Sequence, residues 1–89
     1  MTESHAGVRE LDLSGLKCPL PVLRTRKVLE HAQAGDRIRL ICTDPLTSID
    51  IPHLLRETGD LLEEHVVRAD KQVFLIRRNP RTEMQNGPA

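Results

Sequence analysis

The chain has 89 residues, with 13 basic and 13 acidic side chains and therefore a formal net charge of zero at neutral pH. This length suits a single small domain, and a domain of this size has no room for a large internal ligand cavity. Balanced charge and a single Phe, with no Trp or Tyr, argue against direct nucleic-acid binding, which uses basic surfaces and stacked aromatic rings. The longest apolar run is only residues 73–76, and the first residues lack a signal-peptide pattern, so we expect a cytoplasmic protein with no membrane partner.

The first half of the chain predicts a helix between two strands. Residues 8–13 alternate polar and apolar side chains, as a half-buried strand does. From Pro19 onward apolar side chains recur at helical spacing, and Gly35 favours the left-handed backbone that follows a helix. Residues 37–43 alternate again, with an apolar face made of Ile38, Leu40 and Cys42.

A second helical pattern follows and ends at Gly59. Proline removes a hydrogen bond from a helix interior and clashes with the preceding turn. Pro52 therefore predicts a turn up to Asp50 and a helix that begins only at about Ile51.

The last part of the domain reads as two strands, residues 61–69 and 72–78, joined as a hairpin around Asp70-Lys71. The order β-α-β-α-β-β with short connections predicts an α+β fold. It is a two-layer sandwich in which two helices cover one face of a mixed four-stranded sheet. We expect the domain to cover residues 8–78, with disordered tails at 1–7 and 79–89.

The segment from Gly15 to Pro21 has a composition that suggests chemistry rather than packing. Cys18 directly precedes the first predicted helix, where the positive end of the helix dipole lowers the pKa of a thiol. The stretch from Leu13 to Leu29 contains no acidic residue, and its cations lower that pKa further: Lys17, Arg24, Arg26 and Lys27. We therefore expect Cys18 to be a reactive, nucleophilic thiolate.

Neighbouring residues are expected to shape this loop. Gly15 ends the preceding strand, Pro19 suits the first position of a helix, and Pro21 makes the helix start rigid, so that the thiol stays presented. Leu20 and Leu23 lie off the apolar face of the helix, where they either close over the edge of the core or form an exposed apolar spot. An exposed apolar spot ringed by cations suits docking to an acidic protein. The predicted docking residues are Lys17, Leu20, Leu23, Arg24, Arg26 and Lys27.

Other reactive side chains are expected to be structural. Cys42 shares a face with Ile38 and Leu40, so we expect a buried, inert thiol. No C-x-x-C motif is present, which disfavours a dithiol cycle or a disulfide between the two cysteines. The histidines at positions 5, 31, 53 and 65 lack metal-ligand spacing, so we expect neither a metal nor a cofactor.

The run from Leu11 through Gly15-Leu16-Lys17-Cys18-Pro19-Leu20-Pro21 resembles the Cys-Pro-x-Pro signature of the TusA (SirA-like) sulfur-carrier family. Asp44-Pro45 and Asp50-Ile51-Pro52 resemble the second block of that family. The resemblance covers about residues 9 to 78 and implies the same β-α-β-α-β-β fold. It also implies that Cys18 accepts sulfane sulfur as a persulfide.

The implied partners are two proteins. One is a sulfur donor, either a cysteine desulfurase or a rhodanese-like protein, and the other is a sulfur acceptor in tRNA thiolation or in sulfur oxidation and trafficking. The chain would then be a sulfurtransferase-type carrier rather than a stand-alone catalyst. It departs from the family pattern at two positions, with Leu20 where Glu is frequent and Lys17 where Arg is common. The absence of a carboxylate at position 20 makes the site more electropositive, and the departures leave the pathway open.

Two other functions remain open from the residues. The chain could be a regulatory interaction module in which the Cys18 loop is only a docking surface. It could also be a redox enzyme that alternates Cys18 with Cys42. Substitution of Cys18 by Ser separates the carrier from the interaction module, and substitution of Cys42 by Ala tests the redox enzyme.

Overall fold

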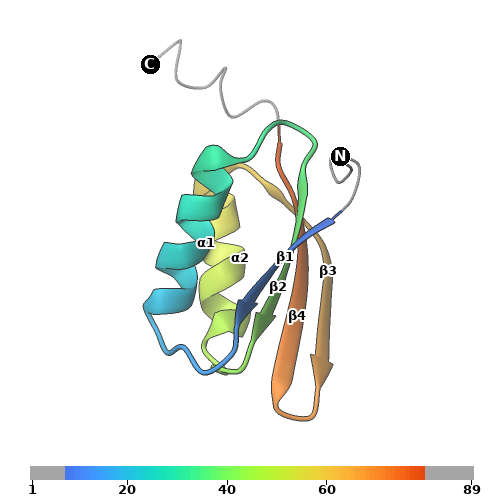
Figure 1. The fold of residues 1–89 in the computed structure, drawn as a ribbon. Helices are drawn as coiled ribbons and strands as arrows, with labels where there is room; N and C mark the ends of the chain where they lie inside the picture. The colour runs from blue at the N-terminus through green and yellow to red at the C-terminus, as the bar shows by residue number, and fades with distance from the viewer. Residues whose placement is uncertain (1–7, 80–89) are drawn as a thin grey trace.

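Six secondary-structure elements follow one another in the predicted order in the computed structural model, which describes residues 8–79 (Figure 1). The predicted tails at 1–7 and from residue 80 onward lie outside the described residues. The elements are β1 (Val8–Leu13), α1 (Leu20–His31), β2 (Arg37–Cys42), α2 (Thr47–Thr58), β3 (Leu61–Arg68) and β4 (Lys71–Arg77).

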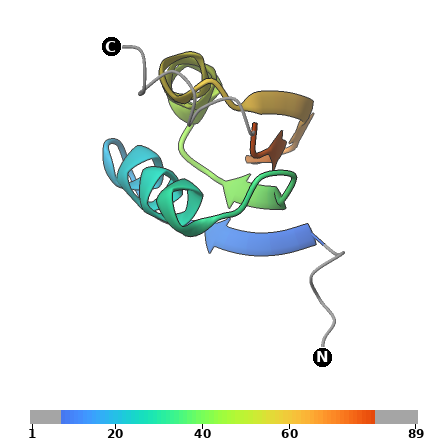
Figure 2. The same ribbon diagram turned by 90° about the horizontal axis from the view of Figure 1, so that it is seen from above.

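The four strands form one mixed sheet in the order β1-β2-β4-β3. β1 runs parallel to β2, whereas the β2–β4 and β3–β4 pairs are antiparallel. Both helices lie on the same face of this sheet, which the view from above shows most clearly (Figure 2). The predicted α+β sandwich is therefore confirmed.

The parallel pairing of β1 with β2 brings the loops that follow these strands close together. In the parallel pair, Leu13 at the end of β1 lies opposite Cys42 at the end of β2. The loops that follow the two strands therefore leave the same edge of the sheet. These loops lead into α1 and α2, so both helices begin at that edge (Figure 1).

The core lies between the helices and the sheet. Apolar side chains from five elements meet there and exclude water, which stabilises the two layers against each other. Cys42 is among them as a fully buried free thiol, as predicted. The buried set is Leu13, Leu29, Ile38, Leu40, Cys42, Ile51, Leu54, Leu55, Phe74 and Ile76.

Helix α1 is shorter than predicted. It begins at Leu20, so that Pro19 is the N-cap residue and Pro21, not Pro19, lies in the first turn. It ends at His31 because Ala32 adopts an extended backbone, with φ of −84° and ψ of 156°. Gly35 does adopt positive φ, but in the turn that leads into β2 rather than at the helix end.

The prediction for the start of α2 is wrong. The helix begins at Thr47 and contains Pro52. Asp44 makes the early start favourable, since its backbone carbonyl accepts hydrogen bonds from both the N–H and the hydroxyl of Thr47. Pro52 then removes only the one hydrogen bond that its N–H would have donated to the Ser48 carbonyl. The helix ends, as predicted, at Gly59, which has φ of +85°.

The hairpin turn is shifted by one residue from the prediction. Arg68 pairs with Lys71, so the turn residues are Ala69 and Asp70, and Ala69 adopts φ of +49°. The register of β3 shifts between Leu62 and Glu64. Within residues 8–79, no helix is long and apolar enough to cross a membrane.

Candidate functional site

Two loops meet at the edge of the sheet where β1 and β2 end. The loop from β1 to α1 carries Cys18, and the loop from β2 to α2 carries Asp44. Two hydrogen bonds join them: the Gly15 N–H donates to Thr43 Oγ1 at 2.8 Å, and the Cys18 N–H donates to Asp44 Oδ2 at 2.7 Å. The second loop therefore fixes the backbone at the cysteine itself.

The residues predicted to shape the loop each have a definite place. Gly15 has φ of +84°, and a Cβ there would meet no atom within 4 Å, so the backbone conformation rather than lack of space favours glycine. The peptide bond between Cys18 and Pro19 is cis. The N–H of Leu20 donates to the Lys17 carbonyl at 2.8 Å, and Pro19 and Pro21 have no N–H. The first residues of α1 therefore offer few free donors to an anion at Cys18.

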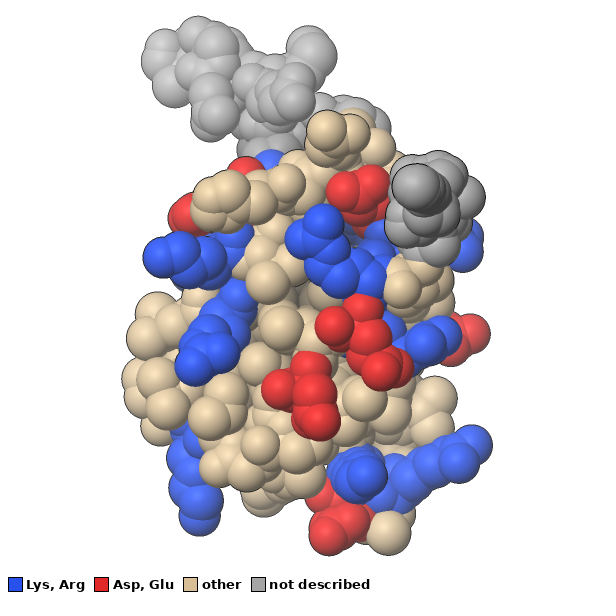
Figure 3. All heavy atoms as spheres, in the orientation of Figure 1, with Lys and Arg blue, Asp and Glu red and all other residues tan. Residues whose placement is uncertain are grey.

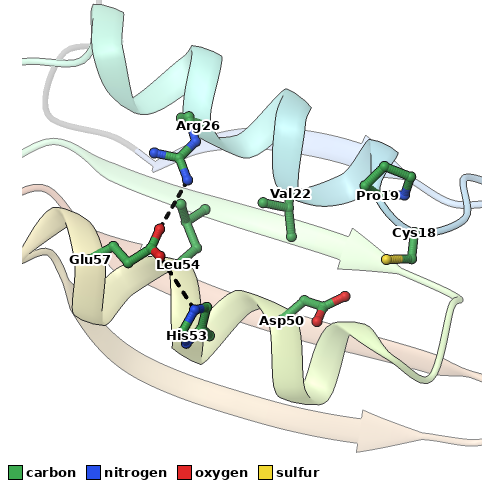
Figure 4. A pocket seen from close by; sticks show the side chains of 8 residues that line it. All are labelled: Cys18, Pro19, Val22, Arg26, Asp50, His53, Leu54 and Glu57. Atoms are coloured by element: carbon green, nitrogen blue, oxygen red, sulfur yellow. Dashed lines mark hydrogen bonds and ion pairs between the residues drawn. The ribbon is translucent and has the colours of Figure 1, made fainter.

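Cys18 lies at one end of a groove between α1 and α2, with a volume of about 280 Å³ (Figure 4). Its side chain is exposed, whereas Cys42 is fully buried. Val22 and Leu54 supply an apolar floor, and charged side chains line the rest. The lining residues are Cys18, Pro19, Val22, Arg26, Asp50, His53, Leu54 and Glu57.

The electrostatic prediction for Cys18 is wrong in sign. The Asp50 carboxylate points toward the thiol from α2 (Figure 4), and as a hydrogen-bond acceptor for the protonated thiol it raises the pKa of Cys18 above its usual value. Partial loss of water around the thiol and the negative charges of Asp50 and Asp44 act in the same direction. The resting site therefore favours the neutral thiol over the thiolate.

The predicted cations do not reverse this effect: Arg26 and Lys17 act on other acidic groups, and Arg24 and Lys27 are exposed. Arg26 points into the groove, where its Nη2 lies 3.1 Å from Glu57 Oε1. The second oxygen of Glu57 lies 3.3 Å from His53 Nε2. The N–H groups of Leu46 and Cys18, followed by the charge of Lys17, lower the pKa of the Asp44 carboxyl. Lys17 thus acts on Asp44, which remains a carboxylate beside the cysteine.

An apolar surface surrounds the cysteine end of the groove. Leu20 and Leu23 of α1 are 44% and 53% exposed. They therefore form an exposed apolar spot and do not close over the edge of the core. Leu46 and Ile49, at the start of α2, are 50% and 66% exposed. Figure 3 shows a largely uncharged area on the α1 side of the molecule with basic side chains above and below it. The exposed cations on the cysteine loop and α1 are Lys17, Arg24 and Lys27.

Sequence reasoning missed the acidic and α2 residues of the site. The predicted site does not include Asp44, Asp50, Leu46 or Ile49, although Asp44 and Asp50 lie in the segments that resemble the second block of the family. A usable signal was available: two parallel neighbouring strands end at one sheet edge, so the loops that follow them meet. That rule would have placed the acidic second loop beside Cys18.

The site is suited to the chemistry of one accessible thiol. Cys18 and Cys42 are both free, and burial raises the pKa of Cys42 to about 11, which keeps it protonated. No group of three or more potential metal ligands is found within residues 8–79. An exposed thiol with no neighbouring reactive thiol can form a bond to an external sulfur atom and hold it.

Comparison with known proteins gives one consistent family. A family model described as Sulfurtransferase TusA matches residues 9–78. The sulfur carrier protein TusA of Allochromatium vinosum is 39% identical over 71 residues, which cover 80% of this chain and 93% of the relative. A putative sulfur carrier protein of Archaeoglobus fulgidus is 39% identical over 57 residues, covering 64% and 74% of the two chains.

The crystal structure of a SirA-like protein from Desulfitobacterium hafniense has the same fold. Its TM-score is 0.69 at 20% sequence identity, and the match covers 82% of this chain and 99% of that one. At this level of identity the likeness concerns the fold alone.

Proposed function

The chain belongs to the TusA family, and from this premise we propose that it carries sulfane sulfur as a persulfide on Cys18 between two partner proteins. The donor is a cysteine desulfurase or a rhodanese-like protein, and the acceptor is a second protein with a reactive thiol. The observation that carries the proposal is the exposure of Cys18 together with the complete burial of the other cysteine, Cys42.

The transfer is a thiol exchange that needs no oxidant. The Cys18 sulfur attacks the outer sulfur of the donor's cysteine persulfide, and the donor's sulfur–sulfur bond breaks. The electron pair of that bond stays on the donor's cysteine sulfur, which takes up the proton that Cys18 releases. The products are a persulfide on Cys18 and a free thiol on the donor. The same exchange in the opposite sense passes the sulfur to the acceptor.

The separation of the two cysteines protects the loaded state. A thiol near a persulfide attacks its inner sulfur, forms a disulfide and expels hydrogen sulfide. Cys42 is fully buried, and burial raises its pKa to about 11, so it supplies no thiolate for that reaction. This arrangement favours a carrier over a redox enzyme that alternates the two cysteines.

The surface around Cys18 supports docking of a protein rather than of a small substrate. Leu20, Leu23, Leu46 and Ile49 are exposed around the thiol, and apolar centres with a polar rim are typical of protein interfaces. Lys17, Arg24 and Lys27 would form a basic part of that rim. Arg26 is instead paired with Glu57 in the groove, so we assign it to the shape of the groove rather than to the rim.

The test is the intact mass of the protein after incubation with a cysteine desulfurase and cysteine, and separately with a rhodanese and thiosulfate. We expect the wild type and Cys42→Ala to gain one sulfur atom that a reductant removes. We expect Cys18→Ser to gain none while keeping its circular dichroism spectrum, because position 18 is exposed. Equal sulfur loading of Cys18→Ser would contradict the proposal.

A regulatory interaction module is the second candidate, and the exposed leucines and Ile49 favour it. In that case partner binding would not need the sulfur atom of Cys18. Cys18→Ser would bind the partner as wild type does, whereas Arg24→Glu combined with Lys27→Glu would abolish binding. Wild-type protein that never gains sulfur from either donor system would favour this candidate.

A further inference from the structure

The charge pattern around Cys18 changes sign between the rim and the centre. Lys17 and two of the three cations of α1, Arg24 and Lys27, are exposed at the periphery. At the centre, the Cys18 N–H is bound to the Asp44 carboxylate at 2.7 Å, and the Asp50 carboxylate points toward the thiol (Figure 4). A partner that covers the site therefore meets cations outside and carboxylates inside.

Among the groups that face the thiol, Asp50 is the carboxylate available to a partner. The Asp44 carboxylate is committed to two backbone N–H groups, those of Cys18 and Leu46. Deeper in the groove, Arg26 and His53 are both within ion-pair distance of Glu57. None of the ion pairs found within residues 8–79 involves Asp50, which lies at the open end of the groove beside Cys18.

We propose that Asp50 makes the reactivity of Cys18 depend on the charge of the docked group, so that a partner activates the thiol by placing a cation beside this carboxylate. The inference rests on the proposed carrier function for its biological meaning, but its physical content concerns the free protein. The partner chemistry that fits is a Lys or Arg side chain adjacent to the partner's reactive sulfur. The partner's outer surface, in contrast, would be acidic to match the rim.

The physical reason is the effect of a near charge on an ionising thiol. In the free protein, the Asp50 carboxylate as a hydrogen-bond acceptor and the negative charges of Asp50 and Asp44 raise the pKa of Cys18, so the thiol is mostly protonated and slow to react. A cation beside Asp50 cancels part of this negative field and favours the thiolate. Activation then occurs where a partner has docked, and the free protein is protected from stray electrophiles.

The test uses two reagents that differ mainly in charge and that both react with thiols. The reagents are the cationic trimethylammonioethyl methanethiosulfonate and the anionic sulfonatoethyl methanethiosulfonate. The rate constant of each reagent with Cys18 is measured at neutral pH and low salt for the wild type, Asp50→Asn, Asp50→Glu and Glu30→Gln. The thiolate fraction affects both rate constants equally, so the cation-to-anion ratio reports the local field at Cys18 alone. Glu30→Gln is the matched control, because it removes one negative charge near the other end of α1. Cys18→Ser gives the background.

We expect the wild-type protein to react faster with the cationic reagent than with the anionic one. Asp50→Asn should lower the cation-to-anion ratio about five-fold, as expected for one unit charge several ångströms from the probe in a solvated site. Asp50→Glu should retain most of the wild-type ratio, and Glu30→Gln should leave it unchanged. An Asp50→Asn ratio equal to that of Glu30→Gln would overturn the proposal.

A pH profile supplies an independent readout. With neutral methyl methanethiosulfonate, the midpoint of the rate against pH should fall in Asp50→Asn, because the carboxylate that raises the Cys18 pKa is gone. A purely structural role of Asp50 would not lower this midpoint, and an unchanged midpoint would contradict the inference. Neither measurement involves sulfur transfer, so failure of the proposed carrier function would be seen separately, as absence of persulfide formation.

Discussion

Gly15 illustrates how a single backbone conformation supports the cysteine. Its φ of +84° lies in the region that glycine adopts without strain, and its N–H donates to Thr43 Oγ1 in the neighbouring loop. Gly35 has nearly the same φ, +89°, in a turn that is remote from Cys18, and neither glycine would bring an added Cβ within 4 Å of another atom. The two glycines therefore form a matched pair for mutation.

We predict that Gly15→Ala and Gly35→Ala each lower the free energy of unfolding by about 1 kcal/mol, the backbone cost of positive φ for an L-residue. Only Gly15→Ala should also slow persulfide formation, because only that turn orients the loop that carries Cys18. Urea unfolding and the rate of sulfur loading measure the two effects. Equal slowing of loading in both variants would show that the loop geometry at Gly15 has no particular importance.

At this scale, the sequence singled out Cys18 as the candidate reactive residue but did not predict the electrostatic environment of its thiol. Cys18 was recognised from its immediate neighbours, a lysine, two prolines and a helix start, all of which are local in the chain. The pKa of its thiol depends on Asp50, which is distant in sequence and reaches the site only through the fold. Counting nearby cations along the chain therefore gave the wrong sign.

At the scale of the elements, Asp60 links the junction between α2 and β3 to the residues that follow β4. Its fully buried carboxylate lies 3.2 Å from Arg78 Nη1 and accepts the Asn79 N–H at 2.8 Å. Asn79 also donates a side-chain hydrogen bond to the Gly59 carbonyl at 2.7 Å, so this residue, which the sequence placed in the tail, is bound to the domain. The cluster extends the pairing of β3 with β4, in which Leu61 lies opposite Arg77, to the end of α2.

We predict that Asp60→Ala lowers the free energy of unfolding by about 3 kcal/mol, because it leaves the mostly buried Arg78 and the Asn79 N–H without this acceptor. The control is Glu10→Ala, which removes one partner of a solvent-exposed pair with Arg39 at 3.6 Å. That variant should lose less than about 1 kcal/mol. Chemical denaturation measures the free energy of unfolding of both variants. Similar decreases in the two would mean that Asp60 contributes no more to stability than a surface carboxylate.

Element type was predictable, whereas several element boundaries were not. The alternation in residues 8–13 and 37–43 reflects burial on one face of the sheet, and the structure has strands at Val8–Leu13 and Arg37–Cys42, within one residue of that expectation. The start of α2 depends instead on hydrogen bonds from Thr47 to the Asp44 carbonyl, which outweigh the local cost of Pro52. The turn at Ala69 depends on the pairing of Arg68 with Lys71, which no residue of the turn reveals.

For the whole molecule, the parallel pairing of β1 and β2 is the feature that creates the site. It places the basic cysteine loop and the acidic loop before α2 at one edge of the sheet, although the chain as a whole has zero net charge. The order of elements predicted a sandwich with both helices on one face. It did not supply the side-chain directions that turn Asp50 toward Cys18 and Arg26 toward Glu57 (Figure 4).

The central claim, that Cys18 holds transferable sulfur, is tested most directly by labelling. The protein is loaded by a cysteine desulfurase with isotopically labelled cysteine sulfur, freed of small molecules and treated with cyanide, which removes sulfane sulfur as thiocyanate. We predict one equivalent of labelled thiocyanate from the wild type and from Cys42→Ala, and none from Cys18→Ser. Label released equally from Cys18→Ser, or label that stays on the wild-type protein, would contradict the account.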